Sequence, residues 1–334
     1  MPATGKYNAL TDVAGVTVGH YTNPKAASGV TVVVCRDGAV AGVDVRGSAP
    51  GTRETDLLAP ANLVDRVQAV VLSGGSVYGL AASDGVVRWL SEKGIGFPLD
   101  ETHVAPIVPA AVLFDLGRGE TYIPPVDAAW GRAACEAAGD AKISLGNVGA
   151  GTGAVSGPIK GGVGSASCVL DSGITVAALI AVNSLGSVIN TETGALWEAG
   201  LEMENEFGSL GKRKVRVPSD GEAVPVGNTT IGVVATDAIL GKAQAQKVAQ
   251  MAQDGVARCV RPSHTMFDGD AIFCVATGRK KLVEMQGFFA SSEAQAINEI
   301  GQTAADCVSR AIIRGVFHAE TLHPFKAFRD LETF

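Results

Sequence analysis

The chain has 334 residues, of which 46% are hydrophobic, so it is long enough to bury one large core or two ordinary ones. Its net charge of −7, with no run of Lys or Arg, excludes the electrostatic footprint of a protein that binds nucleic acid or an anionic membrane. The longest apolar run, residues 174–182, is far shorter than the roughly 18 residues of a membrane span, and the N-terminus lacks a secretory signal. We therefore expect a cytoplasmic protein whose partner is a small molecule.

The first third of the chain contains strand signals followed by a helix. Residues 15–21, 30–35 and 39–45 are rich in β-branched residues and are separated by Asn-Pro, Ser-Gly and Asp-Gly turns, which predicts an antiparallel sheet. A buried strand over 67–75 then runs into a glycine turn. Apolar residues at helical spacing predict a helix over 76–94, with Gly94 as its stop.

The middle of the chain is dense in glycine. A helix is predicted over 127–139, with Asp127 as its N-cap, and a strand over 174–182. Between them, the glycine-rich stretch 145–167 is of the kind that brings backbone N–H groups close to a ligand. Residues 191–224 are polar and charged, which predicts a surface linker.

Regular structure restarts after this linker. We predict strands over 229–237 and 271–278 and helices over 240–255 and 294–316. The order of elements is that of an α/β (α+β) protein with two sheets and helices outside them.

Several common motifs are missing. The chain has no G-x-S-x-G, no H-E-x-x-H and no G-x-x-x-x-G-K-[ST], and its six cysteines form no C-x-x-C, which favours reduced cysteines in the core over a zinc or redox site. Two glycine stretches, SGGSVYG at 73–79 and GAGTGA at 149–154, could pass for phosphate cradles, but such patterns recur by chance in glycine-rich chains.

The junction VGNTTIGVVATD, at 226–237, places two threonines where the linker gives way to a strand. If the Thr229 hydroxyl attacked the Asn228 carbonyl, an ester would form and be hydrolysed, and Thr229 would become an N-terminus. Its amine, with an ordinary pKa of about 7.7–8.0, could then serve as general base to its own hydroxyl. On spacing alone, the better explanation is that Thr-Thr simply starts a strand, where β-branched residues are common.

The segments GNTTIGVVATD and SHTMFDGDAIFCVATG (263–278) resemble the self-processing L-aminopeptidase/D-amidase family, which includes β-peptidyl aminopeptidases and the 6-aminohexanoate-oligomer (nylon-oligomer) endo-hydrolase. The similarity continues through LTDVAGVTVGHY, VLSGGSVYGL, GTGAVSGPIKGGVGSAS and AVNSLG. It implies a four-layer αββα sandwich. It also implies one structural domain, 1–334, cleaved into a large chain, 1–228, and a small chain, 229–334, in a homo-oligomer such as a tetramer. The Asn-Thr junction is more like the nylon-oligomer branch than the serine-bearing aminopeptidase branch.

The resemblance also assigns candidate catalytic residues. They are Thr229 as nucleophile after the cleavage site Asn228, with Tyr78, Lys160, Asn183, Asp268 and Asp270 as its partners.

Physical roles follow from the residue types. Asn183 and the Tyr78 hydroxyl could donate to the oxyanion that forms during amide hydrolysis. Lys160 could lower the pKa of the nucleophile or keep its amine neutral. The two aspartates could orient that amine and Lys160. Taken singly, each residue also has an ordinary explanation: a core aromatic for Tyr78, a surface charge for Lys160, turn residues for the others.

These residues predict an N-terminal-threonine amidohydrolase that acts on short peptides or ω-amino-acid oligomers and needs no metal or organic cofactor. Alternatives are an aminopeptidase/D-amidase that prefers β- or D-amino acids, an acyltransferase resembling ornithine acetyltransferase, and a ligand-binding protein that uses the glycine loops. A calcium loop at Asp268-Gly269-Asp270 lacks the further oxygen ligands at EF-hand spacing.

Overall fold

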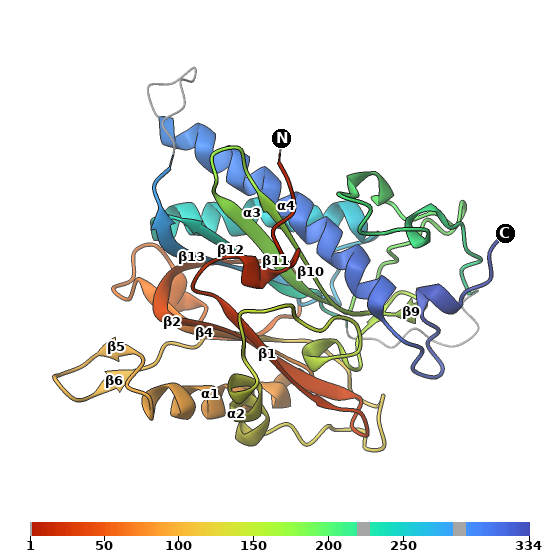
Figure 1. Cartoon of the computed structure of the whole chain (residues 1–334). Coiled ribbons are helices and arrows are strands. Elements are labelled where there is room, and N and C mark those ends of the chain that lie inside the picture. The colour runs from red at the N-terminus through yellow and green to blue at the C-terminus, as the bar shows by residue number, and fades with distance from the viewer. Residues whose placement is uncertain (1, 219–227, 283–291) are drawn as a thin grey trace.

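The computed structural model describes residues 2–218, 228–282 and 292–334, and a large mixed sheet dominates it (Figure 1). Nine strands lie in the order β10-β11-β12-β13-β2-β4-β7-β3, with β1 pairing to β2 outside this path. Their bounds are β1 Thr17–Asn23, β2 Ser28–Val45, β3 Gly51–Arg53, β4 Arg66–Ser73, β7 Ala110–Val112, β10 Gly162–Val169, β11 Thr175–Val182, β12 Ile231–Ala238 and β13 Ala271–Lys280. Two small hairpins pair β5 Phe97–Pro98 with β6 Val104–Ala105, and β8 Val155–Ser156 with β9 Ile159–Lys160.

Strand β2 joins two halves of this sheet. Its first part, from Ser28 to Val34, pairs with β1 and β4, and its last part, from Val40 to Val45, pairs with β13. The register with β4 shifts between Val34 and Ala39, so the strand bends there. The two separate strands predicted on either side of the Asp-Gly signal are therefore one bent strand.

The bend stacks the two halves face to face, with helices on both outer sides (Figure 1). Helices α3 Lys242–Cys259 and α4 Ser292–His318 cover β10–β13, and α1 Ala82–Ser91 and α2 Ala128–Glu136 cover β2 and β4. A central core lies between the half-sheets, where Leu72 belongs to the same cluster as Leu179 and Phe273. The αββα layering and the predicted α/β class are thus confirmed, with β2 linking both layers into one hydrogen-bonded sheet.

The central strands carry apolar residues on both faces because both faces are packed. Every residue of β11 and of β12 is buried, which explains why these segments are continuous rather than alternating apolar runs. All six cysteines are free and buried, as expected. Within the described residues, no helix is long and apolar enough to cross a membrane.

Helix boundaries follow local signals. The carboxylate of Asp127 accepts hydrogen bonds from the N–H groups of Ala129 and Trp130, which confirms it as the N-cap of α2. The helix predicted from residue 76 instead begins with a 3-10 turn, Ser76–Ala81, in which Gly79 packs tightly on the Gly74 carbonyl.

The described part of the predicted linker, 191–218, is packed against the body of the protein. Phe207 is buried and meets the ring of Phe317 edge-on, with centroids 5.8 Å apart, and Glu206 pairs with the buried Arg310. Most of the segment lies at the surface as predicted, but it is not a free linker, because its polar residues bond to distant parts of the chain. Residues 219–224 lie outside the described part.

Candidate active site

Three segments meet beside Thr229 because of the order of the central strands. Strand β12 pairs in parallel with β13, so the residues before both strands, Asn228–Thr230 and Asp268–Asp270, lie next to each other. Strand β11 is antiparallel to β12, so Asn183, the residue after β11, also lies at this edge. The topology alone therefore brings together residues that are far apart in the sequence.

Thr229 is buried, with 5% of its surface exposed, and its hydroxyl lies against the preceding peptide bond. Thr229 Oγ1 is 2.6 Å from the Asn228 carbonyl oxygen, to which it donates. The backbone N–H of Thr229 donates to the carbonyl oxygen of Asn183. The hydroxyl and the carbonyl that it would attack are thus already in contact.

A backbone donor that the sequence analysis missed completes this contact. The N–H of Gly269 donates to the Asn228 carbonyl oxygen and to Thr229 Oγ1, each at 3.2 Å. A Cβ at position 269 would lie 2.9 Å from Thr229 Oγ1 and 2.6 Å from the Ala49 carbonyl oxygen, so the close approach requires glycine. Glycine between two aspartates was the available signal for it.

Asp270 fixes the start of β12. One oxygen of its buried carboxylate accepts from the N–H of Thr230 at 2.7 Å, and the other lies 2.8 Å from His264 Nδ1. Its bonds therefore go to Thr230, the residue after Thr229, and to a histidine that the sequence analysis did not single out.

The Asp268 carboxylate closes the turn that runs from Thr265 to Asp268. Its carboxylate accepts from the N–H and the hydroxyl of Thr265, at 2.9 and 2.5 Å, and from the N–H of Leu185 at 3.3 Å. Burial, and then the charge of Asp270, raise the pKa of Asp268 above its ordinary value. This carboxyl accordingly holds its proton more readily than a solvated one.

The side-chain amide of Asn183 has a fixed orientation. Its Oδ1 accepts from Arg118 Nη1 at 2.6 Å and from the N–H of Val155 at 3.1 Å, while its Nδ2 donates to the Phe114 carbonyl at 3.2 Å. Two donors on the oxygen assign the other end of the amide as NH₂. Within the described residues, this bond to Phe114 is the one hydrogen bond that Nδ2 donates.

Lys160 lies on the short strand β9, which pairs with β8. Its Nζ is fully buried and donates to three backbone carbonyls, those of Gly151, Ala154 and Gly161, at 2.8–3.0 Å. Burial, and then the charge of Arg118, lower the pKa of Lys160 well below its ordinary value. These contacts tie Lys160 to the glycine-rich segment that holds Asn183, and none of them goes to Thr229.

Tyr78 stands apart from this cluster. It lies on the 3-10 turn Ser76–Ala81, is 48% exposed, and makes no hydrogen bond with the described residues. Its turn packs against β3, which follows Ala49, and the Ala49 N–H donates to the Asp268 carbonyl. Tyr78 thus lies on a neighbouring segment and not within the hydrogen-bonded group around Thr229.

Comparison with known proteins identifies relatives of the chain. The chain is 45% identical to an uncharacterized aminopeptidase of Mycobacterium tuberculosis, over 97% of this chain and 98% of that protein. It is 30% identical to the 6-aminohexanoate-oligomer endohydrolase of Kocuria sp. (strain KY2), over 82% of this chain and 76% of that one.

Solved structures share the fold. The L-aminopeptidase D-Ala-esterase/amidase of Ochrobactrum anthropi, described as a variant of the Ntn hydrolase fold, superposes with a TM-score of 0.73 at 23% identity, over 97% of this chain and 90% of that one. A β-aminopeptidase of Burkholderia sp. gives 0.71 at 24% identity, over 96% and 89%. Residues 8–329 match the pattern of Peptidase family S58. The chain is therefore a member of Peptidase family S58, a hydrolase of amide or peptide bonds.

Proposed function

We propose that the chain cuts its own Asn228–Thr229 bond and then acts as an N-terminal-threonine amidohydrolase. The observation that carries this proposal is the contact of 2.6 Å between Thr229 Oγ1 and the Asn228 carbonyl oxygen, with the Gly269 N–H bonded to both atoms. A hydroxyl beside a carbonyl that already accepts a backbone hydrogen bond is arranged for addition to that carbonyl.

Self-cleavage needs only these groups and water. Thr229 Oγ adds to the Asn228 carbonyl carbon, the hydroxyl proton passes to the departing Thr229 nitrogen, and an ester replaces the peptide bond. The Gly269 N–H stabilises the negative oxygen meanwhile. Water then hydrolyses the ester, giving chains of residues 1–228 and 229–334 and restoring the Thr229 hydroxyl.

The freed Thr229 amine acts as general base in turnover. It takes the hydroxyl proton as Oγ attacks a substrate amide, and it returns a proton to the leaving amine, which leaves an acyl ester on Thr229. Water hydrolyses that ester. The Asn183 carbonyl, which accepts from the Thr229 N–H in the uncut chain, is placed to orient this amine.

The neighbouring residues support the nucleophile in different ways. We assign the second Nδ2 hydrogen of Asn183, together with the Gly269 N–H, to the oxyanion. Asp268 and Asp270 hold the 265–270 turn and the start of β12. Lys160 braces the glycine-rich segment that holds Asn183, and Tyr78 would meet substrate only where the substrate extends beyond this group.

The names of relatives suggest the substrate class. Asn228, fully buried beside the nucleophile, stands where the acyl part of a substrate would lie. Short peptides and 6-aminohexanoate oligomers are the substrates we propose, with β- and D-amino-acid amides as the alternative within the same chemistry. We further propose that the cleaved protomers assemble into a homo-oligomer such as a tetramer, whose mass light scattering would measure.

A comparison of wild type with Thr229→Ala and Thr229→Ser tests the proposal. Intact mass should show two chains for the wild type, one uncut chain for Thr229→Ala, and two chains for Thr229→Ser, whose hydroxyl can make the same attack. Only the cut proteins should hydrolyse amino-acid p-nitroanilides or aminohexanoate oligomers. An uncut wild type that hydrolyses these amides would contradict the mechanism, and acetyl transfer from N-acetylornithine to glutamate without amide hydrolysis would contradict the reaction class.

A further inference from the structure

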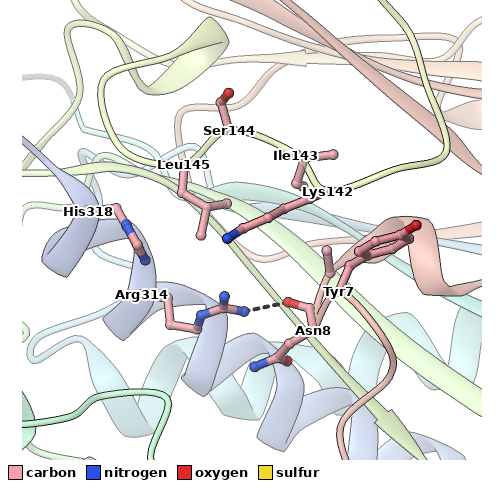
Figure 2. Close-up of a pocket in the computed structure, with 9 residues that line it drawn as sticks. Tyr7, Asn8, Lys142, Ile143, Ser144, Leu145, Arg314 and His318 are labelled. Atoms are coloured by element: carbon pink, nitrogen blue, oxygen red, sulfur yellow. Dashed lines mark hydrogen bonds between the residues drawn. The ribbon is translucent and has the colours of Figure 1, made fainter.

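A cavity of about 570 Å³ lies apart from the hydrogen-bonded residues around Thr229, which we call the Thr229 group (Figure 2). It is formed where the N-terminal segment, the loop after α2 and the last turns of α4 meet. None of its lining residues belongs to the candidate active site. Its volume is within the range of sites that hold small molecules. The lining residues are Tyr7, Asn8, Ala9, Lys142, Ile143, Ser144, Leu145, Arg314 and His318; we call this space the Lys142 cavity.

The charged residues of the Lys142 cavity are all basic. Lys142, Arg314 and His318 line it, and no carboxylate does. In Figure 2 the nitrogen atoms of these three side chains gather toward one end of the hollow. Partial burial, and then the charges of Arg314, Arg329 and Lys142, lower the pKa of His318. The positive charge at the cavity therefore comes from Lys142 and Arg314, while the lowered pKa of His318 favours its neutral imidazole.

The guanidinium of Arg314 is held in place by the protein. Its Nη1 donates to the carbonyl oxygens of Asn8 and Ser165, and only 11% of the side chain is exposed. Glu206 lies 3.7 Å from its Nε. Within the described residues, Nη2 makes no hydrogen bond, and neither does the ammonium of Lys142. Donors therefore remain for a ligand on a group that is already rigid.

The nearby acids are occupied by other partners. Asp12 accepts from the N–H groups of Tyr7 and Ala9, at 2.9 and 3.0 Å, and from the Ser167 hydroxyl at 2.7 Å. Glu206 pairs with Arg310 and accepts from the Asn8 amide at 2.6 Å. Both carboxylates are therefore bonded to groups other than Lys142, and Glu206 also pairs with Arg314 Nε at 3.7 Å.

The remainder of the lining is apolar. Ala9 and Ile143 are buried, and Leu145 and the ring of Tyr7 pack against the central core. Figure 2 shows the Tyr7 ring at the opposite end of the hollow from His318. A ligand that fits both ends carries an anionic head and a short apolar chain.

We propose that the Lys142 cavity binds a small organic carboxylate with an aliphatic chain, its head between Lys142 and Arg314 and its chain along Ile143, Leu145 and Tyr7. This site is separate from the Thr229 group and does not depend on its chemistry. A ligand there would connect the loop after α2 to the end of α4.

Isothermal titration calorimetry of the full protein tests the site, with hexanoate, acetate and inorganic phosphate as probes at constant ionic strength. Hexanoate should bind at least tenfold more tightly than acetate, because its longer chain buries more CH₂ groups. Lys142→Ala should weaken hexanoate binding roughly tenfold or more, since it removes a charge-assisted hydrogen bond. Lys247→Ala, which removes an exposed lysine on α3, is the matched control and should leave binding unchanged.

Further variants separate this site from the active site. Thr229→Ala should bind hexanoate as the wild type does, and Leu145→Ala should lower the advantage of hexanoate over acetate. Absence of hexanoate binding to the wild type, or equal binding to Lys142→Ala, would overturn the site. Phosphate that binds as tightly as hexanoate would overturn the ligand class.

Discussion

The substitution Gly269→Ala probes the step that starts the proposed chemistry. The Gly269 N–H bonds both the Asn228 carbonyl and the Thr229 hydroxyl, and a methyl group there would lie 2.6 Å from the Ala49 carbonyl and 2.9 Å from Thr229 Oγ1. Both distances are shorter than a carbon atom tolerates, so the turn must move away from Thr229. The donor to the nascent oxyanion would move with it.

The size of the effect follows from the loss of one oxyanion donor. Such a loss commonly slows acyl transfer by about 10² to 10³, or about 2.7–4 kcal/mol. We expect self-cleavage of Gly269→Ala to slow by at least about a hundredfold. Amide hydrolysis by any cut protein should fall by a similar factor, because the same N–H serves both steps.

A time course of the uncut chain, followed by intact mass after synthesis, measures this rate. Gly139→Ala is the matched control, because a Cβ at that position meets nothing within 4 Å. Far-ultraviolet circular dichroism verifies that both variants fold. A folded Gly269→Ala protein that cleaves at the wild-type rate would refute the assignment of this N–H to the oxyanion.

Three further predictions concern buried ionisable groups, all measured by urea unfolding in the uncut Thr229→Ala background. Lys160→Met should lower the free energy of unfolding by roughly 3 kcal/mol or more, because three buried carbonyls lose their donor; an unchanged stability would contradict this role. Burial raises the pKa of Asp115 from 3.8 to about 6, which makes the protein less stable by about 3 kcal/mol as the pH rises through this window, so Asp115→Asn should abolish that loss. Burial lowers the pKa of His20 from 6.5 to about 4, which makes the protein less stable by a similar amount as the pH falls through that window. In His20→Asn, the free energy of unfolding should therefore fall as the pH rises from about 4 to about 6, because only the Asp115 effect remains. In Asp115→Asn it should rise over the same range, because only the His20 effect remains. The same pH dependence in both variants would refute the two assignments.

The sequence was sufficient to predict most elements and their layering, because strands and helices here carry strong local signals. It failed at β2, where an Asp-Gly pair that usually marks a turn is overridden by pairing with β4 and β13. It also missed the packing of 191–218, where the charge of Glu206 is balanced by Arg310, about a hundred residues away in the chain. Long-range pairing of this kind leaves no local pattern.

The candidate site was predictable only in part, for a similar reason. Thr229 and Asn183 could be named because they stand in the motifs GNTTIGVVATD and AVNSLG, which resemble those of the family. The Gly269 donor is a backbone group, and the bond from Arg118 to Asn183 depends on the meeting of two loops. Neither contact can be predicted from the types of the residues involved.

The position of β12 and β13 in the sheet has a consequence for the two proposed chains. Both strands belong to the segment 229–334 and pair with each other. On the side away from β13, β12 pairs with β11, and on the side away from β12, β13 pairs with β2; β11 and β2 belong to 1–228. The small chain is therefore an internal part of the larger chain's sheet, and cutting the peptide bond leaves two ladders of backbone hydrogen bonds to hold it. Produced alone, it would expose two open strand edges, which invite aggregation. The two halves should consequently be obtainable as an active pair only when they are first made as one chain.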